Sequence, residues 1–204
     1  MFKKIFILLI MIGVLQANNE YDLKKDFHFF NYSNKVSSKY VDGILKMHKS
    51  NITDKQKQNI IYLFEKEKMI RDSLLVLYKT KYKYEFMPYI ASLTQQHLYI
   101  LKKFMNKYNI ADNIDLLKVG NFNLQVIKEE YDNYLHLSKE SKRTAGEISV
   151  LFMSNLIKAY NEIIYSKPPK DIKRILLKLN AFNKKVLHRF KKGLRNVELG
   201  LPVD

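Results

Sequence analysis

The chain has 204 residues, of which 47% are hydrophobic, with only 6 Gly and 4 Pro. This length and composition suit one compact domain with a sizeable core and exclude a disordered chain. The absence of cysteine excludes disulfides, a cysteine nucleophile and lipid attachment at a cysteine. The net charge of +16 favours anionic partners, but only five of the 36 basic residues are Arg, so we find no firm signal for nucleic-acid binding.

The N-terminus predicts a cleaved signal peptide over residues 1–17. Lys3 and Lys4 precede the apolar stretch 5–15, and Ala17 supplies the small residue of a cleavage site. About 11 apolar residues are too few for an ordinary membrane span. We therefore expect a periplasmic or secreted protein that is not a lipoprotein, and an uncleaved anchor is the alternative.

The next segment, residues 18–50, is expected to form an N-terminal arm with a short helix near 39–49. It is rich in aromatic and polar residues and shows no clear period. A clear helix start follows, because Thr53 and Gln56 have the spacing of a capping box. Apolar residues at three- and four-residue spacing then predict a helix over 54–81.

Four further helices follow by the same criterion, and the chain is therefore predicted to be all-α. Short connections make the first two long helices antiparallel neighbours, and likewise the last two. A long crossover carrying a short extra helix joins these hairpins, within a helical domain over 51–193, and Gly193 predicts a helix stop before a loose tail. The predicted ranges are 86–108, 122–138, 143–165 and 170–192, with the tail at 194–204.

A charged run, EKEKMIRD at residues 65–72, stands out within the helix predicted over 54–81. Glu67 lies in line with that helix's apolar residues, and His97 lies in line with those of the next helix. Both positions are near mid-helix in an antiparallel pair, so we expect the two side chains to meet. A buried carboxylate costs several kcal/mol unless it is paired or bound to a metal.

Two stretches carry distinctive motifs, IYLFEKEKMIRD at 61–72 and IASLTQQHL at 90–98. The first resembles the first-helix signature of an uncharacterised bacterial ferritin-like family, roughly Y-M-x-E-E-E-K-L-A-R-D, and the second resembles that family's second-helix signature, I-A-x-S-E-Q-x-H-M. The resemblance implies a ferritin-like four-helix bundle with one long crossover. It also implies inward carboxylates and histidines that hold two iron or manganese ions, with Glu67 and His97 at ligand positions.

This sequence departs from that ligand pattern at several positions. The acid of the family's Glu-x-x-His pair is Thr94 here, and the acidic pair of the third core helix falls on Ser149 and Val150. The last-helix histidine falls near Asn183. The remaining ligands are too few for the three or four that metal sites need, so we expect a degenerate metal site and no di-metal centre.

Glu67 and His97 therefore have two interpretations. They are the remnant metal-ligand candidates, for iron or manganese. The interpretation that we favour is a buried carboxylate satisfied by Arg71 one turn on, and by His97 or a tyrosine hydroxyl, with Thr94 as a further core polar residue.

The helix over 170–192 has a strongly basic polar half, a pattern compatible with binding anionic surfaces. A solvated face near a helix C-terminus is the interpretation that we favour, because cations suit that end of the helix dipole. The anion-binding candidates are Lys184, Lys185, Arg189, Lys191, Lys192 and Arg195, and His188 lies on the same half of the helix.

The sequence favours an exported, non-catalytic ferritin-like protein of the cell envelope that acts by binding or as a structural component. One alternative is a metal-binding oxidoreductase or metal-storage protein with an atypical site at Glu67 and His97. Another is a basic module that binds anionic lipid, polymer or nucleic acid through the helix over 170–192. We predict no catalytic residue, and the pattern is compatible with a homo-oligomer.

Overall fold

The computed structural model describes residues 21–30 and 39–201, so the predicted signal peptide at 1–17 lies outside the described residues. The described chain is all-α apart from a two-stranded antiparallel sheet, in which β1 (Tyr21–Asp22) pairs with β2 (Lys118–Val119). In this part of the chain, no helix combines the length and apolar character needed to cross a bilayer.

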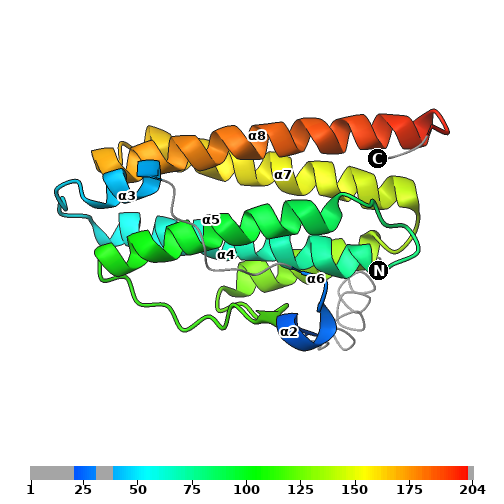
Figure 1. The fold of residues 1–204 in the computed structure, drawn as a ribbon, viewed down its shortest axis with the longest axis horizontal. Helices are drawn as coiled ribbons and strands as arrows, with labels where there is room; N and C mark the ends of the chain where they lie inside the picture. The colour runs from blue at the N-terminus through cyan, green and yellow to red at the C-terminus, as the bar shows by residue number, and fades with distance from the viewer. Residues whose placement is uncertain (1–20, 31–38, 202–204) are drawn as a thin grey trace, which may run out of the picture.

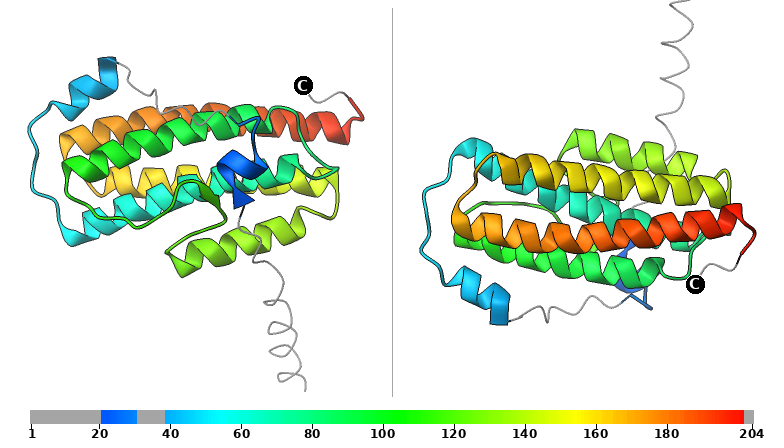
Figure 2. Two further views of the ribbon diagram at one scale, coloured as in Figure 1. Left: turned by 60° about the horizontal axis from the view of Figure 1, so that its bottom comes forward. Right: turned by 90° about the horizontal axis from the view of Figure 1, so that it is seen from above.

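Four long helices run side by side and form the body of the molecule (Figure 1). Each hairpin is antiparallel, with α4 packed on α5 and α7 packed on α8, whereas α5 and α7, which the crossover joins, run in the same direction. Contacts of α4 with α7 and of α5 with α8 close the arrangement, which Figure 2 shows from two sides. The bounds are α4 Asp54–Tyr78, α5 Met87–Lys107, α7 Lys142–Tyr165 and α8 Lys170–Glu198.

The connection between the two hairpins runs from α5 through β2 to α6 (Gln125–Leu137). Helix α6 packs against α4 and α7 on the outside of the four long helices (Figure 2). Of the N-terminal arm, α2 (Leu23–Asp26) adjoins β1, and α3 (Lys39–Leu45) packs on α5 and α8. The crossover with its short helix is therefore present as predicted, whereas β1, β2 and α2 were not predicted.

The start of α4 has the predicted capping box. The Gln56 N–H donates to Thr53 Oγ1 at 3.2 Å, and the Thr53 N–H donates to Gln56 Oε1 at 2.9 Å. The helix ends at Tyr78 rather than at residue 81, because the N–H groups of Lys79 and Thr80 bond to carbonyls three residues back. Such three-residue bonds tighten and close a last turn.

The expectation of a single apolar stripe on α4 is wrong. Every residue from Leu63 to Leu77 is buried, including the charged run at 65–72. The reason is that α5, α6 and α7 all pack around this helix. A helix covered on so many sides cannot present its charged side chains to water, so each of them needs a partner inside the protein.

The predicted stop at Gly193, with a loose tail from residue 194, is also wrong, because α8 continues to Glu198. A glycine inside a helix costs only about 1 kcal/mol. The added turn makes contacts that outweigh this cost. Leu194 packs over Gly146 of α7, and Glu198 pairs with Arg143 at 3.4 Å.

Gly146 provides a test of this close packing between α7, α8 and the α4–α5 connection. A Cβ at this position would overlap the hydroxyl oxygen of Tyr84 and lie 3.1 Å from Cδ1 of Leu194. We expect Gly146→Ala to lower the free energy of unfolding by about 1–3 kcal/mol, measured by urea denaturation. Removing the overlapping oxygen should restore part of the loss in a Gly146→Ala/Tyr84→Phe double variant.

The matched control is Gly43→Ala in α3, where an added Cβ would have no atom within 4 Å. Here we expect no loss, or a gain of about 0.5–1 kcal/mol from the better helix former. Equal stability of Gly146→Ala and the unaltered protein would contradict this account of the packing.

Candidate functional site

One buried carboxylate oxygen joins the four long helices at their centre. Oε1 of Glu67 in α4 accepts a hydrogen bond from the Tyr160 hydroxyl of α7 at 2.7 Å and from Asn183 Nδ2 of α8 at 3.1 Å. His97 Nδ1 of α5 lies 3.1 Å from the same oxygen. The structure thus brings Glu67 and His97 together, identifies Tyr160 as the tyrosine whose hydroxyl bonds the carboxylate, and adds Asn183, which the sequence did not indicate as a partner.

The cluster is closed off from solvent. Glu67 and Tyr160 are fully buried, and His97 is only 6% exposed, with the Phe182 ring edge-on to the imidazole at 4.8 Å. Burial, and then the nearby Glu67 charge, raise the pKa of the Tyr160 hydroxyl well above its ordinary value. The phenol therefore keeps its proton and acts as a hydrogen-bond donor.

The residues around Glu67 do not fit the metal centre that the ferritin-like resemblance implies. They offer one carboxylate, one imidazole, a neutral amide and a protonated phenol, whereas two divalent ions bring four positive charges. Within the described residues, no group of three or more His, Asp or Glu side chains lies close enough to hold a metal ion. Oε2 of Glu67 is buried and has no hydrogen-bond partner among these residues.

The other two core residues singled out from the sequence have different partners from the expected ones. Arg71 Nε donates to Asp72 Oδ1 at 2.7 Å, and the guanidinium also bonds Gln95 Oε1 of α5, so these contacts take the place of the expected pairing with Glu67. Thr94 donates its hydroxyl to the Ile90 carbonyl of its own helix at 3.0 Å. Side-chain bonds to the preceding turn are common for helical threonine.

A second buried polar cluster fastens the crossover to α4. Asp72 Oδ2 accepts from Lys68 Nζ at 2.7 Å and from the Gly120 N–H at 2.9 Å. Lys68 Nζ also donates to the Lys118 carbonyl at 2.6 Å. Gly120 has φ +83°, a backbone conformation that suits glycine. The many charged residues at 65–72 indicated that a polar cluster would form here. Its backbone partners, the Gly120 N–H and the Lys118 carbonyl, could not be recognised from the sequence, because nearly every residue type offers such groups.

The same charged run also holds the chain just before α6. Oε2 of Glu65 accepts the N–H groups of Asn123 at 3.1 Å and Leu124 at 2.9 Å. The Lys66 ammonium pairs with Glu130 of α6. Four charged residues of this run therefore position the crossover and α6, namely Glu65, Lys66, Lys68 and Asp72.

The predicted basic half of α8 is an exposed face that runs the length of the helix, roughly 40 Å. None of its cations forms an ion pair with an acidic residue within the described chain. Three of the chain's five arginines lie here. The exposed basic residues are Lys170, Lys173, Arg174, Lys178, Lys184, Lys185, Arg189, Lys191, Lys192 and Arg195; we call this set the basic face.

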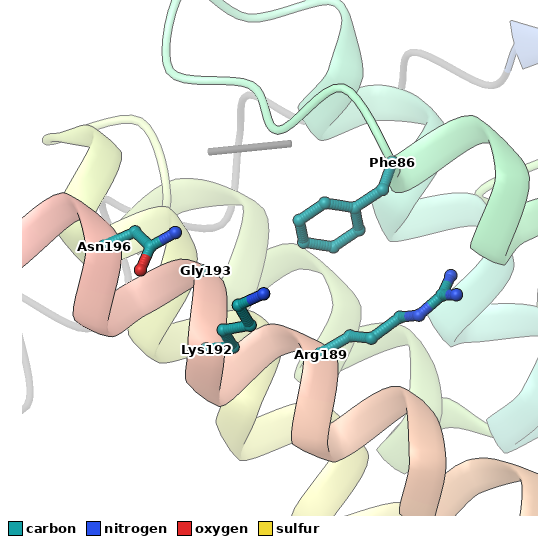
Figure 3. A pocket seen from close by; sticks show the side chains of 5 residues that line it. All are labelled: Phe86, Arg189, Lys192, Gly193 and Asn196. Atoms are coloured by element: carbon teal, nitrogen blue, oxygen red, sulfur yellow. The ribbon is translucent and has the colours of Figure 1, made fainter. Parts of the chain in front are cut away.

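A pocket of about 320 Å³ lies between the C-terminal half of α8 and the start of α5. Figure 3 shows the Phe86 ring facing α8 across this space, with Lys192 and Arg189 extending from α8 below it. Gly193 and Asn196 complete the lining. Two of the predicted anion-binding residues, Arg189 and Lys192, thus share a pocket with an aromatic ring that the sequence analysis did not connect with them.

The four long helices and the crossover are also the part of the chain that matches known proteins. A family model described as an uncharacterised protein domain, DUF2202, matches residues 56–199. An uncharacterised protein of Methanocaldococcus jannaschii, MJ0754, is 26% identical over 156 residues, which is 76% of this chain and 84% of that protein. The crystal structure of the hypothetical protein MJ0754 matches with a TM-score of 0.72 and 25% identity, over 75% of this chain and 87% of the other.

Two substitutions at Glu67 test its role as a shared acceptor. Glu67→Gln keeps a carbonyl oxygen for the three neighbouring donors, so we expect a loss of no more than about 1–2 kcal/mol in unfolding free energy. Glu67→Leu leaves Tyr160, His97 and Asn183 without an acceptor and should cost at least about 3 kcal/mol. Urea denaturation measures both.

The control for the Leu substitution is Glu162→Leu at an exposed position of α7, which should change stability by less than about 0.5 kcal/mol. Similar stabilities for Glu67→Gln and Glu67→Leu would show that the three donors do not depend on this oxygen.

The lowered pKa of the buried Lys68 ammonium predicts that the stability of the protein rises with pH. Burial lowers the pKa of Lys68 from its ordinary value of 10.5 to about 8. Between these values the unfolded chain binds more protons than the folded one, so the free energy of unfolding rises with pH. We expect a gain of about 1 kcal/mol between pH 7.5 and 9, measured by urea denaturation at each pH.

Above about pH 10 the trend should reverse, because burial raises the pKa of Tyr84 and of Tyr134 to about 12. These phenols lose their protons first in the unfolded chain, which favours unfolding. A Lys68→Met variant should lack the rise between pH 7.5 and 9. The same rise in that variant would assign it to another group.

Proposed function

Because this chain belongs to the DUF2202 family of uncharacterised domains, whose description names no activity, we propose its function from its own structure. It is an exported, non-catalytic protein of the cell envelope with a ferritin-like four-helix bundle. It acts by binding an anionic component of the envelope through the basic face of α8. The observation that carries this proposal is the absence of acidic partners for that face among the described residues.

The number of basic residues on the basic face supports an anionic partner. Each lysine or arginine held near an anionic membrane surface contributes about 1 kcal/mol, and the basic face holds several such residues along one straight helix. A solvated face would be expected to interleave acidic residues, yet the acids of α8 are the buried Asp171 and the terminal Glu198. The cations of the basic face, which have no acidic partner among the described residues, form an extended positive surface. Such a surface matches an extended anionic surface better than it matches a single small ligand.

The ferritin-like assignment rests on connectivity and on the centre of the bundle. Two antiparallel hairpins are joined by a long crossover carrying α6, and one polar residue from each long helix meets at Glu67. In ferritin-like bundles, inward side chains at this level hold metal ions. Here the one carboxylate oxygen is occupied by three neighbours, which supports a structural use of the position.

Export is supported by the predicted signal peptide at residues 1–17, which would bring the chain to the periplasm or the outside of the cell. That location also supplies the partner, since anionic phospholipid and anionic polymers are components of the envelope. The proposal of export and the proposal of anion binding are independent, because the basic face is present whether or not the signal peptide is cleaved.

A metal-dependent oxidoreductase or metal-storage protein is the second candidate. The observation in its favour is Oε2 of Glu67, which has no hydrogen-bond partner among the described residues and belongs to the carboxylate that contacts His97. Elemental analysis of the purified protein after exposure to Fe(II) or Mn(II) separates the two proposals. The non-catalytic proposal expects no stoichiometric metal, whereas close to one ion per chain, lost in His97→Ala, would support the second candidate.

The binding proposal predicts salt-sensitive association with anionic vesicles. We expect sedimentation with vesicles containing phosphatidylglycerol, no sedimentation with pure phosphatidylcholine, and a steep loss of binding as salt is raised. Reversing three charges of the basic face, in Lys184→Glu/Lys185→Glu/Lys191→Glu, should weaken binding by about tenfold or more.

The matched control reverses three exposed lysines on other elements, Lys24→Glu/Lys55→Glu/Lys139→Glu, and so gives the same net charge. Binding by the control should fall much less than binding by the α8 variant. An equal loss in both variants would reduce the interaction to overall charge, and no binding to vesicles, polyphosphate or DNA would refute the proposal.

A further inference from the structure

We propose that the pocket between α8 and the start of α5 binds a phosphate monoester, with the phosphate held by Arg189 and Lys192 and the attached group packed on the Phe86 ring. The pocket is lined by these residues together with Gly193 and Asn196. The inference rests on the proposed function, since Arg189 and Lys192 belong to the basic face. It adds a specific ligand chemistry to a surface that otherwise binds by charge alone.

The apolar side of the pocket is a fixed aromatic surface. Phe86 is half-buried and packs on Phe190 of α8 with ring centroids 5.3 Å apart, and on Tyr84 at 5.6 Å. Gly193 is buried and brings no side chain, so the backbone of α8 forms the opposite wall. A ring or short carbon chain fits between these two surfaces.

The polar side of the pocket carries two cations in different settings. The Arg189 guanidinium lies over the Tyr89 ring at 5.6 Å, which restrains its position. Lys192 extends from α8 three residues further on and also lies below the Phe86 ring (Figure 3). Arginine beside a second cation matches a phosphate dianion, because its planar fork donates two hydrogen bonds to one anion.

No acidic side chain neutralises these cations within the described residues. The acids that lie nearest in sequence to the lining residues are paired elsewhere. Glu85 lies 3.5 Å from Lys83 and accepts from the Tyr78 hydroxyl at 3.2 Å, and Glu198 pairs with Arg143 at 3.4 Å. The pocket therefore keeps an unbalanced positive charge for a ligand.

The size of the pocket limits the ligand. A volume of about 320 Å³ lies at the lower end of small-molecule sites, which suits one phosphate and one ring- or glycerol-sized group. Such a group is supplied either by a soluble phosphate ester or by the headgroup of a monoester lipid such as phosphatidic acid. The two sources share the same chemistry at the pocket.

The test is isothermal titration calorimetry of the mature chain with phenyl phosphate and with inorganic phosphate. We expect saturable binding of phenyl phosphate that weakens by roughly tenfold or more in Arg189→Gln/Lys192→Gln. The matched control is Lys24→Gln/Lys139→Gln, which removes the same charge from exposed positions outside the basic face and the pocket and should bind phenyl phosphate as before. Circular dichroism checks that each variant remains helical.

A third variant tests the apolar side of the pocket. Phe86→Leu keeps an apolar side chain but removes the ring, so it should weaken phenyl phosphate binding severalfold and leave the binding of inorganic phosphate unchanged. An unchanged affinity for phenyl phosphate in this variant would overturn the role of the Phe86 ring.

Vesicles containing phosphatidic acid distinguish the two sources. If the ligand is a lipid headgroup, Arg189→Gln/Lys192→Gln weakens binding to these vesicles more than binding to phosphatidylglycerol vesicles, whose phosphate is a diester. If the ligand is soluble, the loss is confined to phenyl phosphate. Absence of saturable phenyl phosphate binding, or equal losses in the two double variants, would overturn the inference even where the protein still binds anionic vesicles.

Discussion

A single oxygen atom, Oε1 of Glu67, receives hydrogen-bond partners from the other three long helices, and the arrangement of these helices depends on it. Tyr160, Asn183 and His97 reach it from α7, α8 and α5. Apolar contacts between helices tolerate sliding and rotation, whereas three directed bonds to one buried acceptor hold only at one relative position. The desolvation of the carboxylate opposes folding, and the convergence of donors offsets that cost.

A second set of polar contacts extends from the same helix to the outside of the bundle. Asp72, Lys68 and Glu65 hold backbone groups of the crossover, and through it they place α6 against α4 and α7. The charged residues at 65–72 of α4 therefore act inward, whereas the exposed basic residues of α8 face solvent. Within the described chain none of these α8 cations forms an ion pair with an acidic residue, which is why the proposed binding functions lie there.

Much of the fold could be predicted from the sequence because helical periodicity and end signals are local. The Thr53 capping box and the mid-helix positions of Glu67 and His97 both follow from spacing along the chain. The contributions of Tyr160 and Asn183 could not be assigned in the same way. They depend on how α7 and α8 are rotated about their own axes, which periodicity alone does not specify.

The incorrect expectations have a common physical cause. Burial of the whole run at 65–72 requires α6 to cover α4, and Arg71 turns to Asp72 and Gln95 because they are also buried there. Gly193 is a stop signal only where packing beyond it is weak, and Leu194 packs over Gly146. In each case a long-range contact outweighed a local preference.

The burial of α4 on all sides has a consequence for how the chain reaches this structure. The α4–α5 hairpin alone would leave Glu67 without Tyr160 and Asn183, and Asp72 without the Gly120 amide. The partners of α4 come from segments that span most of the later chain, so their sequence separation is large. We therefore expect the closure of long loops to contribute to the folding barrier, and the bundle to unfold as one cooperative unit.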